Sequence, residues 1–172
     1  IIKSNALSVP VVIVGNIRIG GTGKTPTVLA IAKVLKAQGF HPGIISRGYK
    51  GSSQEVVEVS AASLPSIVGD EPCYMASQLQ DLNIPIFVHP ERVKAGQELL
   101  KQYPHVDVII SDDGLQHYSL KRWPAREGGH DIELVIRDAR GEGNQFLLPA
   151  GPLRESANLS LIHISEPTRR RG

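Results

Sequence analysis

A glycine-rich turn set between an apolar run and an amphipathic stretch constrains this chain more than any other feature. The apolar run, Val9–Val14, is continuous and mostly β-branched, which indicates a strand buried on both faces of a parallel sheet. After the turn, Thr25–Gln38 carries apolar residues at helical spacing, with Pro26 in the first turn and Gly39 as the stop. The segment therefore predicts a strand, a loop and a helix in direct succession.

The same alternation continues along the chain. Two further stretches predict helices and four short apolar runs predict strands: helices at Pro72–Leu82 and Glu91–Tyr103, and strands at Gly43–Arg47, Ile84–Val88, Val106–Ile110 and Asp131–Arg137. Alternation of this kind predicts an α/β fold with a mainly parallel sheet flanked by helices. Between these elements, Gly48–Ser66 is polar and serine-rich around a weak strand at Glu55–Val59.

Composition narrows the class of protein. The chain has 172 residues, of which 41% are hydrophobic and 21% charged, so a single domain with a real core is expected. The net charge of +2 excludes a disordered chain or one that coats nucleic acid. The apolar runs are far shorter than the roughly 18–20 residues of a membrane span. A single cysteine, Cys73, cannot form an internal disulfide, and a reducing cytosol fits this composition best.

The glycine-rich turn carries the sharpest chemical signal. It is the string Gly20-Gly21-Thr22-Gly23-Lys24-Thr25, directly between the predicted strand and helix. Glycines let backbone N–H groups approach a phosphate, a lysine reaches the β- and γ-phosphates, and a hydroxyl binds Mg²⁺. The usual pattern has a further glycine where this chain has Arg18, so the loop must open differently. The alternative is a turn that binds no ligand, but motif, strand and helix together favour a three-layer P-loop NTPase-like fold.

A second signal follows the predicted strand Val106–Ile110. It is the adjacent pair of carboxylates Asp112 and Asp113. At the end of a parallel strand beside a phosphate loop, a carboxylate holds Mg²⁺ directly or through water. Two neighbouring carboxylates also repel each other unless a cation is present. The alternative is that one or both cap the following turn, where Gln116 and His117 extend the polar cluster.

A third candidate is Asp70, in the string Val68-Gly69-Asp70-Glu71-Pro72. Asp70 is predicted at the N-cap position of a helix, with Pro72 in its first turn. A carboxylate at a helix N-terminus is stabilised in its charged form. That position suits a structural cap, and it equally suits a base or a metal ligand that faces a phosphate site.

Six strings of the sequence, taken in order, resemble one family. They are Val14-Gly15-Asn16, Gly20–Thr25 followed by Pro26, Ser46-Arg47-Gly48-Tyr49, Val68–Pro72, Ser111–His117 and Leu148-Pro149-Ala150-Gly151-Pro152-Leu153-Arg154-Glu155. Together they closely resemble the tetraacyldisaccharide 4′-kinases, the lipid A 4′-kinases of Gram-negative bacteria. The resemblance extends from about Val9 to Glu155, and the phosphate loop of that family also lacks the first glycine.

The resemblance implies an activity and its cofactors. A member of this family transfers the γ-phosphate of ATP, with Mg²⁺, to the 4′-hydroxyl of a tetraacylated glucosamine disaccharide 1-phosphate in lipid A biosynthesis. The implied partners are ATP and the lipid A disaccharide 1-phosphate, with no nucleic acid. The implied location is the cytoplasmic side of the bacterial inner membrane, where the protein is peripheral or anchored.

The resemblance also implies roles for individual residues. Lys24 and Asp70 match the catalytic positions, with Asp70 as the base for the sugar hydroxyl. The implied nucleotide-binding residues are Gly20, Gly21, Thr22, Gly23, Lys24, Thr25, Gln116 and His117. The implied metal ligands are Thr25, Glu71, Asp112 and Asp113. Arg47 and Arg92 lie at predicted strand and helix boundaries, where each either contacts phosphate or is solvated.

Domain boundaries follow from the resemblance. We expect a partial kinase domain at residues 1–159, without the N-terminal membrane segment and the C-terminal lobe of the family. Residues 160–172 are expected to be a non-native tail, because they resemble translated sequencing-adapter sequence. Trp123–His130 looks like an insertion relative to the family.

Rival functions stay open at this point. A MinD-type regulatory ATPase needs a lysine where this chain has Ile19, which counts against it. A GTP-dependent switch needs an Asn-Lys-x-Asp string, which the sequence lacks. An inactive nucleotide-binding fragment of the kinase is compatible with all of the motifs above.

Overall fold

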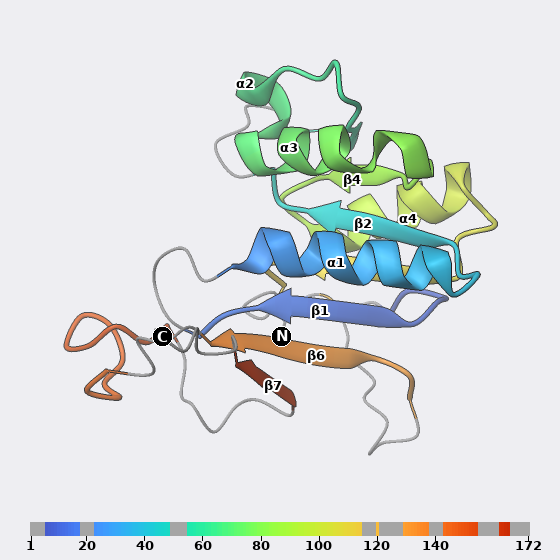
Figure 1. Cartoon of the computed structure of the whole chain (residues 1–172). Helices are drawn as coiled ribbons and strands as arrows, with labels where there is room; N and C mark the ends of the chain where they lie inside the picture. The colour runs from blue at the N-terminus through green and yellow to red at the C-terminus, as the bar shows by residue number, and fades with distance from the viewer. Residues whose placement is uncertain are drawn as a thin grey trace, which may run out of the picture.

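The computed structural model describes residues 6–17, 23–48, 55–114, 120, 129–137, 143–154 and 162–165. In this part of the chain, seven strands form one sheet in the order β3-β4-β2-β5-β1-β6-β7 (Figure 1). The strands are β1 (Val11–Gly15), β2 (Pro42–Ser46), β3 (Val57–Glu58), β4 (Ile86–Val88), β5 (Val108–Asp112), β6 (Ile132–Arg137) and β7 (Ile162–Ser165). The helices are α1 (Lys24–Ala37), α2 (Pro65–Val68), α3 (Asp70–Leu79) and α4 (Arg92–Gln102), with a short 3₁₀ helix η1 (Gln80–Leu82) after α3.

The central strands of the sheet are parallel. β5 lies between β1 and β2, with Ile110 opposite both Val12 and Ile44. β3 pairs with β4 in the antiparallel direction. Parallel strands of one sheet that follow each other in the chain need a crossover connection, and helices provide it between β1 and β2 and between β4 and β5. The mainly parallel α/β sheet predicted from the sequence is therefore confirmed.

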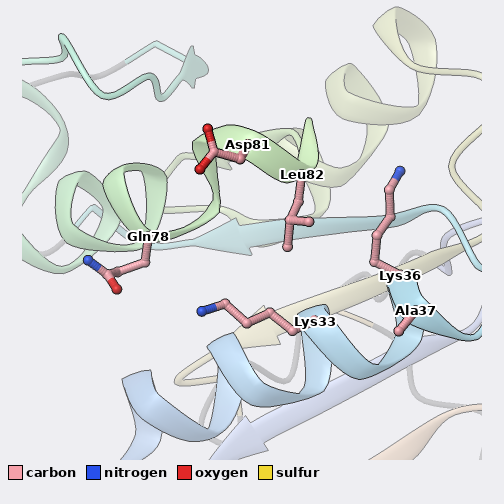
Figure 2. A pocket seen from close by; sticks show the side chains of 6 residues that line it. All are labelled: Lys33, Lys36, Ala37, Gln78, Asp81 and Leu82. Carbon is pink, nitrogen blue, oxygen red and sulfur yellow. The ribbon is translucent and has the colours of Figure 1, made fainter.

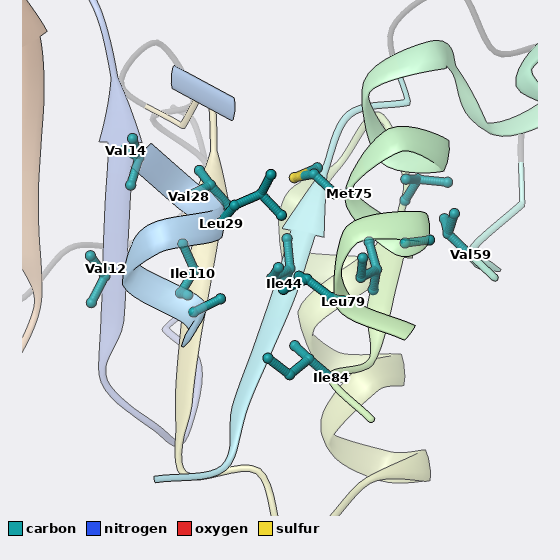
Figure 3. Close-up of a cluster of buried hydrophobic side chains, with 14 of the residues drawn as sticks. Val12, Val14, Val28, Leu29, Ile44, Val59, Met75, Leu79, Ile84 and Ile110 are labelled. Atoms are coloured by element: carbon teal, nitrogen blue, oxygen red, sulfur yellow. The ribbon is translucent and has the colours of Figure 1, made fainter. Parts of the chain in front are cut away.

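Alternate residues of β1 face opposite sides of the sheet, and each side has its own apolar core. Val12 and Val14 pack with side chains of α1 and α3 in the first core, which Figure 3 shows from close by. Val11 and Ile13 belong to the second core, to which α4 contributes Leu99. The sheet is thus the middle layer, with α1 and α3 on one side and α4 on the other (Figure 1).

Most predicted elements are present, with ends that differ by a few residues. β5 begins and ends two residues later than predicted, so Asp112 is its last residue. Ser111 and Asp112 remain in the strand because they pair with Ile13 and Val14 of β1. α2 has no counterpart among the predicted elements, and the helix predicted at Pro72–Leu82 starts earlier and divides into α3 and η1.

The prediction that Asp70 is an N-cap residue is wrong. The N-cap of α3 is Gly69, whose φ of 95° favours glycine, and Asp70 is the first helical residue. Gly69 also ends α2, where its N–H donates to the carbonyl of Pro65 at 2.8 Å. No side chain in the described residues caps α3, so the Asp70 carboxylate has no capping role.

Two stretches singled out in the sequence lie at the margin of the structure. β7 pairs with β6 in parallel and extends the sheet at its edge. It lies within residues 160–172, and the assignment of those residues to a non-native tail stays a prediction. Residues 123–128, most of the predicted insertion at Trp123–His130, lie outside the described residues. No helix in the described part of the chain is long and apolar enough to cross a membrane.

The close approach of β2 to α4 gives a test of the second core. A Cβ on Gly43 would lie 2.8 Å from Cδ2 of the buried Leu99 and 3.3 Å from Cγ1 of Val106. Gly43→Ala is therefore expected to lower the free energy of unfolding by about 1–3 kcal/mol, measured by urea unfolding followed by circular dichroism. In the Leu99→Ala background the same change should cost clearly less. An equal loss in both backgrounds would contradict the contact.

Candidate functional site

The carboxyl ends of β2, β5 and β1 meet at one edge of the sheet, because these strands are neighbours and parallel. Ser46 ends β2, Asp112 ends β5, and Asn16 follows β1. α1 begins at this edge with Lys24, whose side chain reaches Asn16. In open α/β sheets, ligands bind beyond the carboxyl ends of the strands. This edge is therefore the expected position of a ligand site.

Lys24 is held at the start of α1 by side chains from two other elements. Its Nζ donates to Oδ1 of Asn16 at 3.0 Å and lies 3.1 Å from Oδ1 of Asp113. The contact with Asp113 is an ion pair rather than a hydrogen bond, since that oxygen is without a hydrogen-bond partner in the described structure. Only 15% of the Lys24 side chain is exposed. The ammonium group is thus oriented in advance at the carboxyl edge of the sheet.

The N-terminus of α1 has the form of an anion site. Its N-cap is Gly23, with a left-handed φ of 76°, and no side chain among the described residues caps the helix. The hydroxyl of Thr27 donates to the Gly23 carbonyl at 2.9 Å, which holds the N-cap residue. The first N–H groups of an uncapped helix have no acceptor within the helix and point outward beyond its N-terminal end. The helix dipole also favours negative charge at that end. A phosphate group fits this position.

Asp112 is buried at the end of β5, with 1% of its surface exposed. Ser46 Oγ donates to its Oδ2 at 3.2 Å, whereas Oδ1 has no hydrogen-bond partner within the described structure. Burial raises the pKa of the Asp112 carboxyl to about 6, and the negative charges of Glu71 and Asp113 add to the shift. Lys24 and Ser46 act on it in the opposite direction. A buried carboxylate with an unused oxygen and two negative neighbours is suited to hold a cation.

Asp113 links several elements of the site. Its φ is 50°, so the chain turns sharply after β5. Its two carboxylate oxygens lie 3.1 Å from Lys24 Nζ and 3.7 Å from Arg154 Nη1. The segment around Arg154 is anchored, because Leu153 is buried and the Arg154 N–H donates to the Ile17 carbonyl at 2.7 Å. An arginine from far along the chain is therefore brought to Asp113, next to the lysine.

Asp70 and Glu71 lie in the first turn of α3, and both are exposed. Their helix begins shortly after Val68, and Val68 lies close to Gly48, which follows β2. A Cβ on Gly48 would lie only 3.0 Å from the carbonyl oxygen of Val68. The negative charge of Glu71 raises the pKa of Asp112, which requires the two carboxylates to be near each other. The first turn of α3 therefore approaches the same edge of the sheet as Lys24.

The structure covers the other predicted site residues only in part. Gly23 and Thr25 stand at the start of α1. Five predicted nucleotide-binding residues lie outside the described residues: Gly20, Gly21, Thr22, Gln116 and His117. Within the described ranges, no group of three or more His, Cys, Asp or Glu side chains is arranged to hold a metal ion. The metal roles of Thr25, Glu71, Asp112 and Asp113 stay predictions.

Three residues of this site received no role from the sequence. Asn16, Ser46 and Arg154 each lie in a string that carries the family resemblance. Asn16 and Ser46 could have been found from their position, because polar residues at the carboxyl ends of buried parallel strands are candidates for ligand binding. Arg154 is remote from Asp113 in the sequence, and only the folded chain brings the two together.

A separate surface groove lies between α1 and the α3–η1 segment (Figure 2). Its volume is about 620 Å³, and it is lined by Lys33, Lys36, Ala37, Gln78, Asp81 and Leu82. Lys33 follows Lys24 by nine residues, so at 1.5 Å per helical residue it lies roughly 14 Å further along α1. The groove is thus distinct from the candidate site. The candidate site is identified by its charged side chains and not by a cavity.

Comparison with known proteins identifies the family. Residues 1–165 match the family described as LpxK, tetraacyldisaccharide-1-P 4′-kinase. The chain belongs to this family. A tetraacyldisaccharide 4′-kinase of Polynucleobacter asymbioticus is 61% identical over 158 residues, which are 91% of this chain and 43% of that protein. One of Herminiimonas arsenicoxydans is 50% identical over 155 residues, which are 90% of this chain and 40% of that protein.

A crystal structure from the LpxK family is also similar. LpxK from Aquifex aeolicus, in complex with ATP, has a TM-score of 0.74 and 32% identity, over 91% of this chain and 47% of that chain. This likeness confirms the fold class predicted from the sequence. The chain spans less than half the length of these LpxK relatives.

The surroundings of Asp112 predict how stability depends on pH. The folded-state pKa of about 6 is above the ordinary value of 3.8. The folded state therefore binds more protons than the unfolded state between these values, and stability falls as the pH rises from about 4 to about 6. Asp112→Asn removes this penalty, so above pH 6 the variant should be more stable than the wild type by on the order of 1–3 kcal/mol. The gain should disappear near pH 4.

Urea unfolding of the purified chain at pH 4 and pH 7.5, without divalent cations, measures this difference. Asp81→Asn is the control, because Asp81 is an exposed carboxylate outside the site. It should show no gain that depends on pH. An Asp112→Asn variant that is less stable than the wild type at pH 7.5 would count against an unfavourable buried charge.

Proposed function

We propose that this chain provides the nucleotide-binding lobe of an ATP-dependent lipid A 4′-kinase. In the proposed reaction, the γ-phosphate of ATP passes to the 4′-hydroxyl of a tetraacylated glucosamine disaccharide 1-phosphate. The observation that carries the proposal is Lys24 at an uncapped helix N-terminus, paired with Asp113 beside the buried Asp112. The family match, the names of the relatives and the ATP in the Aquifex aeolicus structure support it.

In the proposed function, Lys24 and Arg154 bind the phosphates of ATP. Phosphoryl transfer depends mainly on positioning and on stabilising negative charge. The ammonium group of Lys24 and the guanidinium of Arg154 lie beside Asp113, and the first turn of α1 adds N–H donors. A triphosphate that enters this edge meets donors that are already oriented, so little reorganisation is needed during the reaction.

Mg²⁺ fits the donor set beside Lys24. The ion prefers oxygen ligands, and Oδ1 of Asp112 is a buried carboxylate oxygen without a hydrogen-bond partner in the described structure. When bound, the ion supplies positive charge that offsets the charge of the phosphates and the repulsion among the carboxylates. The residues that would hold it are Thr25, Glu71, Asp112 and Asp113.

Asp70 is the proposed base for the sugar hydroxyl. It is exposed in the first turn of α3, and it makes no capping hydrogen bond that would occupy its carboxylate. A general base must be free to accept a proton and within reach of the hydroxyl that attacks the γ-phosphate. The proposal assigns the neighbouring Glu71 to the metal and Asp70 to the acceptor, with Gln116 and His117 at the nucleotide.

The proposed substrate also implies where the enzyme works. A disaccharide with four acyl chains resides in a membrane, so we infer a location at the cytoplasmic face of the inner membrane, where ATP is available. Nucleic acid is not an expected partner, because the net charge is only +2. The family match favours the kinase over a MinD-type regulatory ATPase.

Lys24→Met tests the nucleotide site. The variant should bind Mg·ATP at least about 10-fold more weakly, because hydrogen bonds to charged groups contribute about 1.5–3 kcal/mol each. Isothermal titration calorimetry on the purified chain measures the affinity. Lys33→Met is the matched control, since Lys33 is an exposed lysine on the same helix, and it should bind ATP as the wild type does. Equal affinities for wild type and Lys24→Met would refute the assignment.

Asp70→Asn tests the base in the full-length gene product. We expect kcat for phosphate transfer to fall by about 10²–10⁴, while ATP affinity and the melting temperature stay close to wild type, because Asp70 caps nothing. Transfer of labelled phosphate from ATP to the disaccharide gives the rate, and Asp81→Asn serves as the control. Unchanged turnover would return Asp70 to an ordinary surface position. ATP binding without any transfer by the purified 172-residue chain would favour the inactive nucleotide-binding fragment.

A further inference from the structure

Arg92 is a charged residue that the proposed reaction has not yet used. It is the first residue of α4, and it is fully buried, with 0% of its surface exposed. Its Nη2 donates to the carbonyl oxygens of Asp112 and Asp113, each at 3.1 Å. Arg92 therefore holds the backbone of the turn that carries both carboxylates.

Burial of this guanidinium is unfavourable in itself. It lowers the pKa of Arg92 to about 10, and the positive charge of Arg47 adds to the shift. Asp112 and Asp113 oppose it. Nε and Nη1 of Arg92 have no hydrogen-bond partner in the described structure. A methionine would fill the same space without a buried charge, so packing alone does not explain an arginine here.

The turn after β5 needs such a contact, because its backbone is strained. Asp113 has a φ of 50°, in the left-handed region that residues other than glycine seldom adopt. Gly114 follows, and a Cβ on it would lie 2.6 Å from Ser111 Oγ and 2.9 Å from Cγ2 of Ile13. The chain therefore leaves β5 along a narrow path against β1.

The strained turn directs two adjacent carboxylates to different partners. Asp112, still within β5, accepts a hydrogen bond from Ser46 of β2. Asp113, one residue later, lies against Lys24 and Arg154. A rotation of the peptide group between Asp112 and Asp113, whose carbonyl oxygen accepts a hydrogen bond from Arg92, would change the direction of one carboxylate relative to the other.

We propose that Arg92 is a positioning residue, which fixes the directions of the Asp112 and Asp113 carboxylates through the two carbonyl oxygens. The inference rests on the proposed function of this site. Arg92 does not contact phosphate itself, because its guanidinium is enclosed and its Nη2 is bound to the turn. Of the two alternatives that the sequence left open for this residue, a phosphate contact or a solvated side chain, the buried position supports neither.

Arg92→Lys in the full-length gene product tests this role, because lysine keeps the charge but lacks the planar fork of the guanidinium. We expect the Mg²⁺ concentration for half-maximal ATP turnover to rise at least about 10-fold and kcat to fall about 10–100-fold. The KM for ATP at saturating Mg²⁺ should change by less than about 3-fold, because Lys24 and the N-terminus of α1 are untouched. Lys94→Met, an exposed change on the same helix, is the matched control and should leave all three values unchanged.

Two results would overturn the proposal. The first is a lower melting temperature with kcat, KM and the Mg²⁺ requirement unchanged per folded molecule, which would make Arg92 purely structural. The second is a raised KM for ATP with unchanged kcat, which would make it a phosphate contact. A wild-type enzyme that turns over ATP without phosphorylating the disaccharide contradicts the proposed function alone, because the Arg92→Lys comparison uses ATP turnover.

Hydrogen exchange on the wild-type protein decides the matter if Arg92→Lys does not fold. The Gly114 N–H donates to the Val14 carbonyl at 3.3 Å, directly after the turn that Arg92 holds. A fixed turn should make this amide exchange as slowly as the amides within β5. Exchange as fast as in an unstructured peptide would show that the turn opens freely and that Arg92 does not fix it.

Discussion

The position of β5 between β1 and β2 is the constraint on which the candidate site depends. In the observed register Asp112 lies opposite Val14, so the loop after β1 and the turn after β5 leave the sheet side by side. A slip of one residue would turn Asp112 to the other face of the sheet and away from Ser46. The register is held by apolar side chains that are buried on both faces of the sheet. The apolar interior therefore sets the geometry of the polar edge.

The same interior explains how much the sequence could predict. Parallel strands buried on both faces appear as continuous apolar runs. Asp112 and Asp113 come just after one such run, and Lys24 follows another at the end of the glycine-rich turn. Gly69 was missed as the N-cap of α3 because α2, with four residues, is too short to produce a periodic signal. Arg92 begins an amphipathic helix, where a charged residue is ordinarily solvated, and it is buried only because carbonyl groups from a distant strand end accept its hydrogen bonds. Contacts of this kind depend on topology, which local patterns do not encode.

Two charged groups at this edge, Asp112 and Arg92, are buried close together without pairing with each other in the described structure. Asp112 is buried with its ionised form disfavoured, and Arg92 is buried with its ionised form disfavoured as well. The two groups do not form a direct ion pair in the described structure, since Arg92 binds the backbone and not the Asp112 carboxylate. Unused polar atoms remain on both: Oδ1 on the aspartate, and Nε and Nη1 on the arginine. An arrangement selected for stability alone would satisfy these atoms or replace them with apolar groups.

These unfavourable terms are consistent with a site whose best state is the occupied one. A ligand that binds only the folded chain stabilises it in proportion to the logarithm of its concentration relative to Kd. A cation beside Asp112 would remove the repulsion from Glu71 and Asp113 that disfavours its charged form. An anion at the start of α1 would likewise satisfy helix N–H groups that no described side chain caps. Each ligand would relieve a separate unfavourable feature of the same edge. The turn held by Arg92 joins the two features, because it carries both Asp112, the proposed ligand of the cation, and Asp113, which forms an ion pair with the lysine at the helix N-terminus.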